Sequence, residues 1–168
     1  MKNNIRSIKY GFSLLEVLVA LAIFSIGLLG LANLQGQSIS SSYNAHLRTQ
    51  ATSLARSIVD RMRANRDQAV VVNNYFTNFE QNPPANITNC STVDCSAEDM
   101  ASLDLLEWKC NLGVYMQESF CSNLVSQATL PNGDGQIEAD GSSGQTKVTV
   151  RWTDTSGTEH EVIMFSSL

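Results

Sequence analysis

Glu16 is the most unusual charged residue of this 168-residue chain, because it stands inside a long apolar segment. A carboxylate within a membrane-spanning helix costs about 2.5–3.5 kcal/mol at the bilayer centre, so it calls for a partner of opposite charge. If a peptidase cut the chain after Gly11, the new α-amino group of Phe12 would lie four residues before Glu16, on the same face of a helix. The spacing therefore predicts an acid–amine pair; a carboxylate solvated at the membrane interface is the alternative.

The four cysteines are the second group of residues that can form bonds of their own. Cys90, Cys95, Cys110 and Cys121 do not have the spacing of paired C-x-x-C zinc ligands. In an oxidising compartment two disulfides are expected, and three connectivities are possible. We favour Cys90 with Cys95 and Cys110 with Cys121, because short loops close most readily.

No pattern in the chain is typical of an enzyme or a metal site. His46 and His160 lack a Ser, Asp or Cys context that would mark either as catalytic. The run Asn132–Glu138 is superficially similar to a calcium loop, but the EF-hand pattern fails where it falls on Leu130 and on Gly141, and turn glycines explain the run better. We therefore expect no catalytic residue, no metal and no cofactor.

The segment that carries Glu16 runs from Phe12 to Leu34 and contains no other charge. As a helix its 23 residues would span roughly 34 Å, enough to cross a bilayer core of about 30 Å. Basic residues precede it at Lys2, Arg6 and Lys9, so the positive-inside tendency predicts a cytoplasmic N-terminus and an exported C-terminal part. A cleaved secretory signal is disfavoured, because the apolar stretch is long and no A-x-A pattern follows it.

The stretch GFSLLEVLVA, residues 11–20, resembles the processing site of type IV prepilins and type II secretion pseudopilins. That resemblance implies cleavage after Gly11 by a dedicated prepilin peptidase and N-methylation of Phe12. It also implies that Glu16 pairs with an N-terminus during assembly. Loss of the leader would change the side-chain charge from −5 to −8, since 16 acids and 8 of the 11 bases remain.

The pattern of residues 35–66 predicts that the same helix continues and is amphipathic there. Its apolar positions recur in steps of three and four, at Leu47, Ala51, Leu54, Ala55, Ile58 and Met62. The Ser-rich stretch Gln37–Asn44 is its weakest part, and Asn65 is a candidate left-handed cap at its end. The arginines of the RMRANR run, 61–66, favour helix-dipole compensation and salt bridges over nucleic-acid binding, which the net charge of −5 also disfavours.

Further stretches of the sequence narrow the resemblance to one subfamily of this class. Residues 51–66 are similar to the helix end of PilV-type minor pilins, in which an RMRAN run is typical, and Ile26–Ala32 earlier in the helix agrees with this. The LPNGDG run, residues 130–135, and the closing hairpin also look like that subfamily. The resemblance covers both ends of the chain and leaves residues 67–96 and 110–121 unmatched.

The remaining elements are predicted from local patterns. Residues 67–96 are expected to form mainly loop. A helix should open at Ser96, capped with Asp99, and present Met100, Leu103, Leu106 and Trp108 near one face. Leu124–Thr129 is expected to resume a helix before Pro131, while residues 111–120 are ambiguous.

The C-terminal part is predicted to be strand-like. Short strands are expected around residues 136–139, 147–153 and 159–165, with Val162 and Met164 on one face of the last strand and Ile163 and Phe165 on the other. A three-stranded antiparallel sheet packed over the amphipathic helix gives an α+β chain with the type IV pilin fold. The predicted parts are a leader (1–11), a transmembrane and pilus-core helix (12–34), its amphipathic continuation (35–66) and a periplasmic head (67–168).

The resemblance implies a PilV-type minor pilin, a structural subunit that helps prime type IV pilus assembly at or near the tip. Its implied partners are other minor pilins, the major pilin, prepilin peptidase and a PilY-type tip adhesin, with no nucleic acid. Before assembly the chain would cross the bacterial inner membrane once. An I-class minor pseudopilin of a type II secretion system and a competence pseudopilin in DNA uptake are the alternatives.

Overall fold

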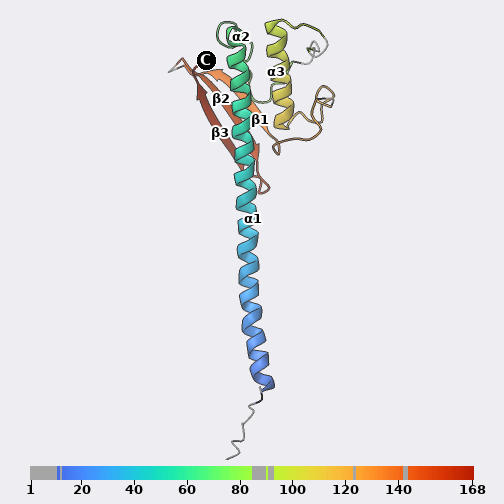
Figure 1. The fold of residues 1–168 in the computed structure, drawn as a ribbon, viewed down its shortest axis with the longest axis vertical. Helices are drawn as coiled ribbons and strands as arrows, with labels where there is room; N and C mark the ends of the chain where they lie inside the picture. Colours follow the sequence, from blue (N-terminus) through green and yellow to red (C-terminus); the bar gives the residue numbers. More distant parts are fainter. Residues whose placement is uncertain (1–10, 12, 85–89, 91–92, 123, 142–143) are drawn as a thin grey trace, which may run out of the picture. The chain divides into compact units, whose positions relative to one another are not determined.

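The computed structural model describes residues 11, 13–84, 90, 93–122, 124–141 and 144–168. These residues form three helices and then three strands. In chain order they are α1 (Leu14–Ala64), α2 (Arg66–Val70), α3 (Ala97–Leu112), β1 (Asp134–Ala139), β2 (Thr146–Thr153) and β3 (Glu159–Ser166) (Figure 1). The chain divides into two units, Met1–Tyr43 and Asn44–Leu168, and the second unit is called the head below.

In the first unit α1 is built from Leu, Ala, Ile and Val with no proline, which suits a continuous helix. Its side chains are exposed from Leu14 to Tyr43. The Ser-rich stretch Gln37–Asn44, indicated by the sequence as the weakest part, is helical throughout. It contains no residue that interrupts the ladder of hydrogen bonds between residues four apart.

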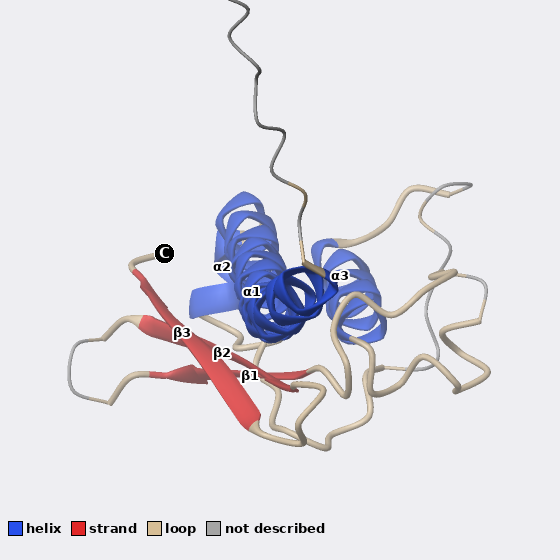
Figure 2. Cartoon of the chain, turned by 90° about the horizontal axis from the view of Figure 1, so that it is seen from below, coloured by secondary structure: helices blue, strands red, loops and turns tan. Residues whose placement is uncertain are grey.

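In the head α1 buries one stripe of side chains in the core. The predicted stripe is confirmed: Leu54 is partly buried, and its other members are fully buried, namely Leu47, Ala51, Ala55, Ile58 and Met62. Val59 is buried as well and widens the stripe. Figure 2 shows the sheet on one side of this part of α1, with α3 beside it.

The sheet is an antiparallel meander in the order β1-β2-β3. Val148 at its centre pairs with Ile137 on β1 and with Met164 on β3. The inward side chains of the three strands join the core, and they are Ile137, Val148, Val150, Trp152, Val162 and Met164. The predicted α+β fold, a long apolar N-terminal helix packed against a small antiparallel sheet, is confirmed.

Helix α3 begins as predicted but faces the core differently. Ser96 accepts a hydrogen bond from the Asp99 backbone and Asp99 caps in return, which forms a complete capping box. The predicted face is confirmed at Leu106 and Trp108, which are buried, and is wrong at Met100, which is exposed; the residues of α3 in the main core are Ala101, Leu105, Trp108 and Leu112. Trp108 Nε1 donates to the Leu54 carbonyl at 3.0 Å and so fixes the rotation of α3 against α1.

Asn65 is not a left-handed cap. Its φ is −123° and the chain continues directly into α2, so that prediction is wrong. The Asn65 side chain instead donates to the Ala97 carbonyl at 2.7 Å, at the start of α3. The amide is thus used for a tertiary contact rather than for ending α1.

The second predicted helix segment, Leu124–Thr129, is also wrong. Its described residues form turns and bends. Thr129 and Leu130 donate their backbone N–H groups to the carbonyls of Asn111 and Leu112, each at 3.2 Å. These bonds tie the segment to the last turn of α3, and the N–H groups that a continuing helix would use are already taken.

Candidate functional site

The first candidate site is the start of α1, where the predicted processing residues lie. The Ser13 carbonyl accepts hydrogen bonds from the backbone N–H groups of Glu16 at 3.0 Å and Val17 at 3.3 Å, so the helix begins immediately before Leu14. Glu16 lies in the first turn, where the positive end of the helix dipole favours a carboxylate. Gly11 is exposed. Phe12 lies outside the described residues, so its predicted methylation stays a prediction.

The helix that follows Glu16 exposes its apolar side chains on every face. None of the most apolar 18-residue window of α1 is buried, and its mean hydropathy is 2.5. By length and composition this one helix qualifies to cross a membrane. Such a surface is stable only in lipid or against neighbouring apolar helices.

Glu16 has no ion-pair partner within the described part of the chain. Its side chain borders an open, largely apolar hollow, lined also by Val17, Ala20, Leu21 and Phe24. A carboxylate that lipid or other apolar helices cover is costly unless a cationic group pairs with it. The arrangement is compatible with the predicted pairing to an N-terminal amine, which stays a prediction.

The RMRAN run forms the joint between α1 and the rest of the head. Arg61 donates to Asp104 and to Glu107 on α3, each at 2.7 Å. The Tyr75 hydroxyl donates to the other oxygen of Asp104 at 2.6 Å. Burial, and then this hydrogen bond to Asp104, raises the pKa of Tyr75 above its ordinary value. Arg63 pairs with Asp60 at 3.2 Å. The run is thus used for salt bridges, as the sequence indicated.

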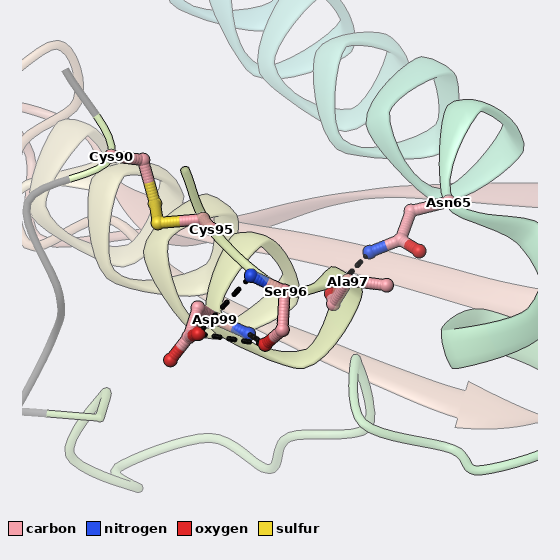
Figure 3. Close-up of a disulfide and its surroundings, with 6 residues drawn as sticks. All are labelled: Asn65, Cys90, Cys95, Ser96, Ala97 and Asp99. Atoms are coloured by element: carbon pink, nitrogen blue, oxygen red, sulfur yellow. Dashed lines mark hydrogen bonds between the residues drawn. A yellow bond between two sulfur atoms is a disulfide. The ribbon is translucent and has the colours of Figure 1, made fainter. Parts of the chain in front are cut away.

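The Cys90–Cys95 disulfide lies just before α3, next to this joint (Figure 3). Ser96 and Asp99 form the capping box immediately after it, and Asn65 reaches the same turn through the Ala97 carbonyl. The disulfide and the cap therefore fix where α3 begins relative to the end of α1.

The second disulfide joins Cys110 on α3 to Cys121. Both are fully buried and form a small apolar cluster with Leu106 and Tyr115. The described chain has no free cysteine, and the two bonds have the connectivity that the short loops favoured. The bond closes the segment 110–121, whose fold local sequence patterns did not predict.

An ion pair that the sequence analysis missed lies at the centre of the head. Lys109 Nζ donates to Asp134 Oδ1 at 2.8 Å, with side-chain exposures of 0% and 2%. It also donates to the Asn78 carbonyl at 2.8 Å, and the other Asp134 oxygen accepts the Glu80 N–H at 2.6 Å. Burial lowers the pKa of Lys109, and the neighbouring Asp134 carboxylate opposes that effect. Together these bonds attach the loop around residues 78–80 to α3 and β1.

The buried Lys109–Asp134 pair accounts for Asp134 in the calcium-like run, residues 132–138. The Asp134 carboxylate is buried and accepts three hydrogen bonds, from Lys109 Nζ and from the backbone N–H groups of Glu80 and Gly135. Gly135 is not a turn glycine as predicted, because it lies in β1, where an added Cβ would collide with Trp108 Cη2. The described residues contain no cluster of three or more potential metal ligands.

The two histidines lie on different elements, and the described residues give neither of them a catalytic arrangement. His46 is exposed on α1. His160 stacks on the Trp152 ring, 5.7 Å between centroids, and its Nε2 lies 3.0 Å from Asp154. Hydrogen bonds from Ser156, then from His160, lower the pKa of Asp154. The Ser156 hydroxyl donates to Asp154 and not to His160, so the described residues of this hairpin end lack the serine–histidine hydrogen bond that would activate a nucleophile.

The basic residues of the C-terminal part are already paired. Apart from His160, residues 67–168 carry three basic residues, Lys109, Lys147 and Arg151. Each of the three forms an ion pair with a carboxylate, to Asp134, Glu138 and Glu80 respectively. The described surface of this part therefore offers no unpaired lysine or arginine to a nucleic-acid backbone.

Two family profiles match the chain. The first, Tt1218-like, described as type IV pilin Tt1218, matches residues 33–106. The second, the prokaryotic N-terminal methylation motif, matches residues 6–32 and so covers Gly11, Phe12 and Glu16. No curated protein and no solved structure matches the chain.

Proposed function

This chain is a type IV pilin that carries the N-terminal methylation motif, and from that premise we propose that it is a minor pilin of the PilV type. Type IV pilins are structural subunits, not enzymes, and they assemble with other pilins after processing by prepilin peptidase. The proposed role is to prime pilus assembly at or near the tip, with other minor pilins, the major pilin and a PilY-type adhesin as neighbours.

The observation that carries the PilV assignment is where its two characteristic stretches lie. The RMRAN run links α1 to α3 through Arg61, with Asp104 and Glu107 as its partners. The LPNGDG run supplies Asp134 to the buried ion pair and Gly135 to the contact with Trp108. Both stretches serve the internal joints of the head, so their presence supports a shared head architecture rather than a chance similarity.

The processing proposed for this chain follows from the motif. Prepilin peptidase removes the leader, residues 1–11, and methylates Phe12. The helix from Phe12 to Leu34 anchors the precursor in the inner membrane with the leader in the cytoplasm and the head in the periplasm. During assembly the helix exchanges lipid for neighbouring apolar helices, and Glu16 pairs with an N-terminal amine.

Copy number and pilus count test the minor-pilin role. Deletion of the gene should reduce the number of surface pili, and expression of the intact chain should restore it. In sheared pili the chain should be far less abundant than the major pilin. Undiminished pili after deletion, or this chain as the dominant pilus subunit, contradicts the proposal. Normal pili with a loss of protein secretion would identify an I-class pseudopilin instead.

Intact-mass analysis tests the processing steps. The mature chain should have lost residues 1–11, carry one methyl group on Phe12 and contain two disulfides, and cells without the peptidase should retain the leader. Glu16→Ala should insert into the membrane normally and assemble poorly, while Glu16→Asp serves as the charge-preserving control. Normal pilus numbers in Glu16→Ala cells would refute the assigned role of the carboxylate.

A further inference from the structure

The two edges of the head sheet differ. On the β1 edge, Thr77 forms an antiparallel bridge with Ile137, through backbone bonds of 3.1 and 2.8 Å in the two directions. On the β3 edge, no backbone hydrogen bond joins Glu159–Ser166 to any described segment other than β2. Figures 1 and 2 show β3 at the outer margin of the sheet. The chain itself occupies the β1 edge at Ile137, whereas no described segment pairs with the β3 edge.

Strand β3 has few of the features that protect an edge strand from pairing, because its charged side chains, Glu159 and Glu161, lie only in its N-terminal half. It pairs with β2 in unbroken register over eight residues, from Glu159 to Ser166, and contains neither a proline nor a lysine. Bulges, prolines and lysines are what natural sheets use to prevent strand addition. An open edge of this length presents a row of N–H and C=O groups that only another extended backbone satisfies.

The outer face of β3 is apolar at its C-terminal half. Ile163 and Phe165 are 44% and 52% exposed. Their cross-strand neighbours on β2 are polar, since Thr149 lies opposite Ile163 and Lys147 opposite Phe165. The exposed apolar surface of the sheet is thus concentrated on the open strand, where a docked strand would cover it.

The N-terminal half of β3 is acidic. Within the described part of the head, neither Glu159 nor Glu161 forms an ion pair, since Arg151, which lies opposite Glu161 on β2, pairs with Glu80 instead. A complementary strand therefore carries lysine or arginine opposite these two residues and apolar side chains opposite Ile163 and Phe165. A second copy of this chain does not fit, because the open strand that it offers is β3 itself, which has two acids and no lysine or arginine.

We propose that the free edge of β3 is the docking site for an edge strand from the head of a different pilin subunit. The added strand extends the sheet by β-augmentation, with its basic end at Glu161 and its apolar end at Phe165. The partner class rests on the family assignment and on the proposed minor-pilin function.

A photo-crosslinking experiment detects this docking directly. The intact chain, expressed in its own cells, carries benzoylphenylalanine in place of Phe165 or, as the control, in place of Val93, which is also 52% exposed. The expected result is an adduct from position 165 with a different pilin, mapped to one of that pilin's strands, and none from position 93. Equal adducts at both positions, no adduct, or an adduct only with a second copy of this chain would overturn the proposal.

Substitutions test the energetics of the same surface. Ile163→Lys introduces a charge that natural edge strands use against pairing, and Val114→Lys is the control because Val114 is equally exposed at 44%. Ile163→Lys should lower the yield of the position-165 adduct by about tenfold, as expected for a central interface residue, with the control within about twofold. Glu161→Lys should lower it as well. An unchanged yield in Ile163→Lys would overturn the docking mode.

These experiments can refute the proposed priming role and the proposed docking surface on β3 independently of each other. If deletion of the gene leaves pili intact while position 165 still forms adducts with another pilin, the edge docks a pilin and the priming role is wrong. If deletion removes pili but position 165 forms no adduct, the priming role stands and the docking surface is wrong.

Discussion

Removal of the Lys109 ammonium is the sharpest test of what holds the head together. Of the ion pairs in the described residues, Lys109–Asp134 is the one in which both side chains are fully buried. The substitution Lys109→Met keeps most of the aliphatic volume and leaves the Asp134 carboxylate buried without a counter-charge. The head should therefore lose far more stability than the loss of one surface salt bridge would produce.

The magnitude follows from the geometry of the pair. At 2.8 Å and an effective dielectric constant of about 20, the Coulomb attraction is about 6 kcal/mol before the cost of desolvation is subtracted. Removal of one partner of a buried pair costs about 3–5 kcal/mol. Asp134 retains hydrogen bonds from the N–H groups of Glu80 and Gly135, so we expect the lower end, about 3 kcal/mol.

The chain supplies a matched control in the Lys147–Glu138 pair, whose carboxylate lies on β1 as that of Asp134 does. Lys147 pairs with Glu138 at 3.0 Å, but these side chains are 31% and 40% exposed. Lys147→Met should therefore cost no more than about 1 kcal/mol. The double variant Lys109→Met/Asp134→Asn should recover about 1 kcal/mol relative to Lys109→Met. It removes the uncompensated buried charge, but the amide NH2 then faces one of the two backbone N–H groups, of Glu80 or Gly135, that the carboxylate accepted.

Urea unfolding of the intact chain in detergent micelles measures these differences. Both tryptophans, Trp108 and Trp152, are buried in the head, so their fluorescence reports unfolding of the head and not of the apolar helix. If Lys109→Met costs no more than Lys147→Met, or if the double variant is no more stable than the single one, the account of a charge-compensated centre is refuted.

Three further predictions use the same fluorescence assay. Gly135→Ala should destabilise the head by about 1–3 kcal/mol, because its Cβ overlaps Trp108, whereas Gly141→Ala, which meets open space, should change little. Removal of the Cys110–Cys121 disulfide by Ser substitutions should cost about 3 kcal/mol from the 11-residue separation, and a cost below 1 kcal/mol would contradict the loop-closure argument. Burial raises the pKa of Tyr115 from 10.0 to about 12, so its contribution is present below pH 10 and is lost as pH rises towards 12. Tyr115→Phe should remove that part of the loss of stability at alkaline pH. The Tyr115 hydroxyl forms no hydrogen bond within the described residues, so the variant should also be more stable at pH 7 by about 1 kcal/mol. A steeper loss of stability at alkaline pH in the variant would refute this.

The parts of the fold that the sequence predicted are those with a simple period. The stripe of α1 repeats every three to four residues, and all of its predicted members are at least partly buried. The alternation in residues 147–153 predicted which side of β2 faces the core, as Val148, Val150 and Trp152 confirm. In these segments the spacing of apolar residues follows from the geometry of a single helix or strand, because that element buries one face.

The parts that the sequence did not predict depend on contacts between distant segments. Lys109 and Asp134 are 25 residues apart, and each has an ordinary local explanation, as a helix-end lysine and as a turn aspartate. Asn65 has the residue type of a left-handed cap, yet its amide is used by Ala97 in α3. A lysine on the apolar side of a helix, next to Trp108, was the one local signal that a buried counter-charge was needed.

The apolar helix and the open strand place different limits on which subunits can be neighbours. Leu14–Leu34 exposes apolar side chains on all faces, and such a surface packs against any similar helix with little preference. The pairing proposed for Glu16 would add a requirement for an amine, but Glu16 lies in the N-terminal methylation motif and so would not separate one pilin with that motif from another. An edge strand is more selective, because backbone register and the order of acidic and apolar residues must both match. If this subunit has a defined place among other pilins, its head must discriminate between neighbouring subunits. Strand β3 can do so, because its open backbone edge carries acidic residues at one end and apolar residues at the other, and a partner strand must match both.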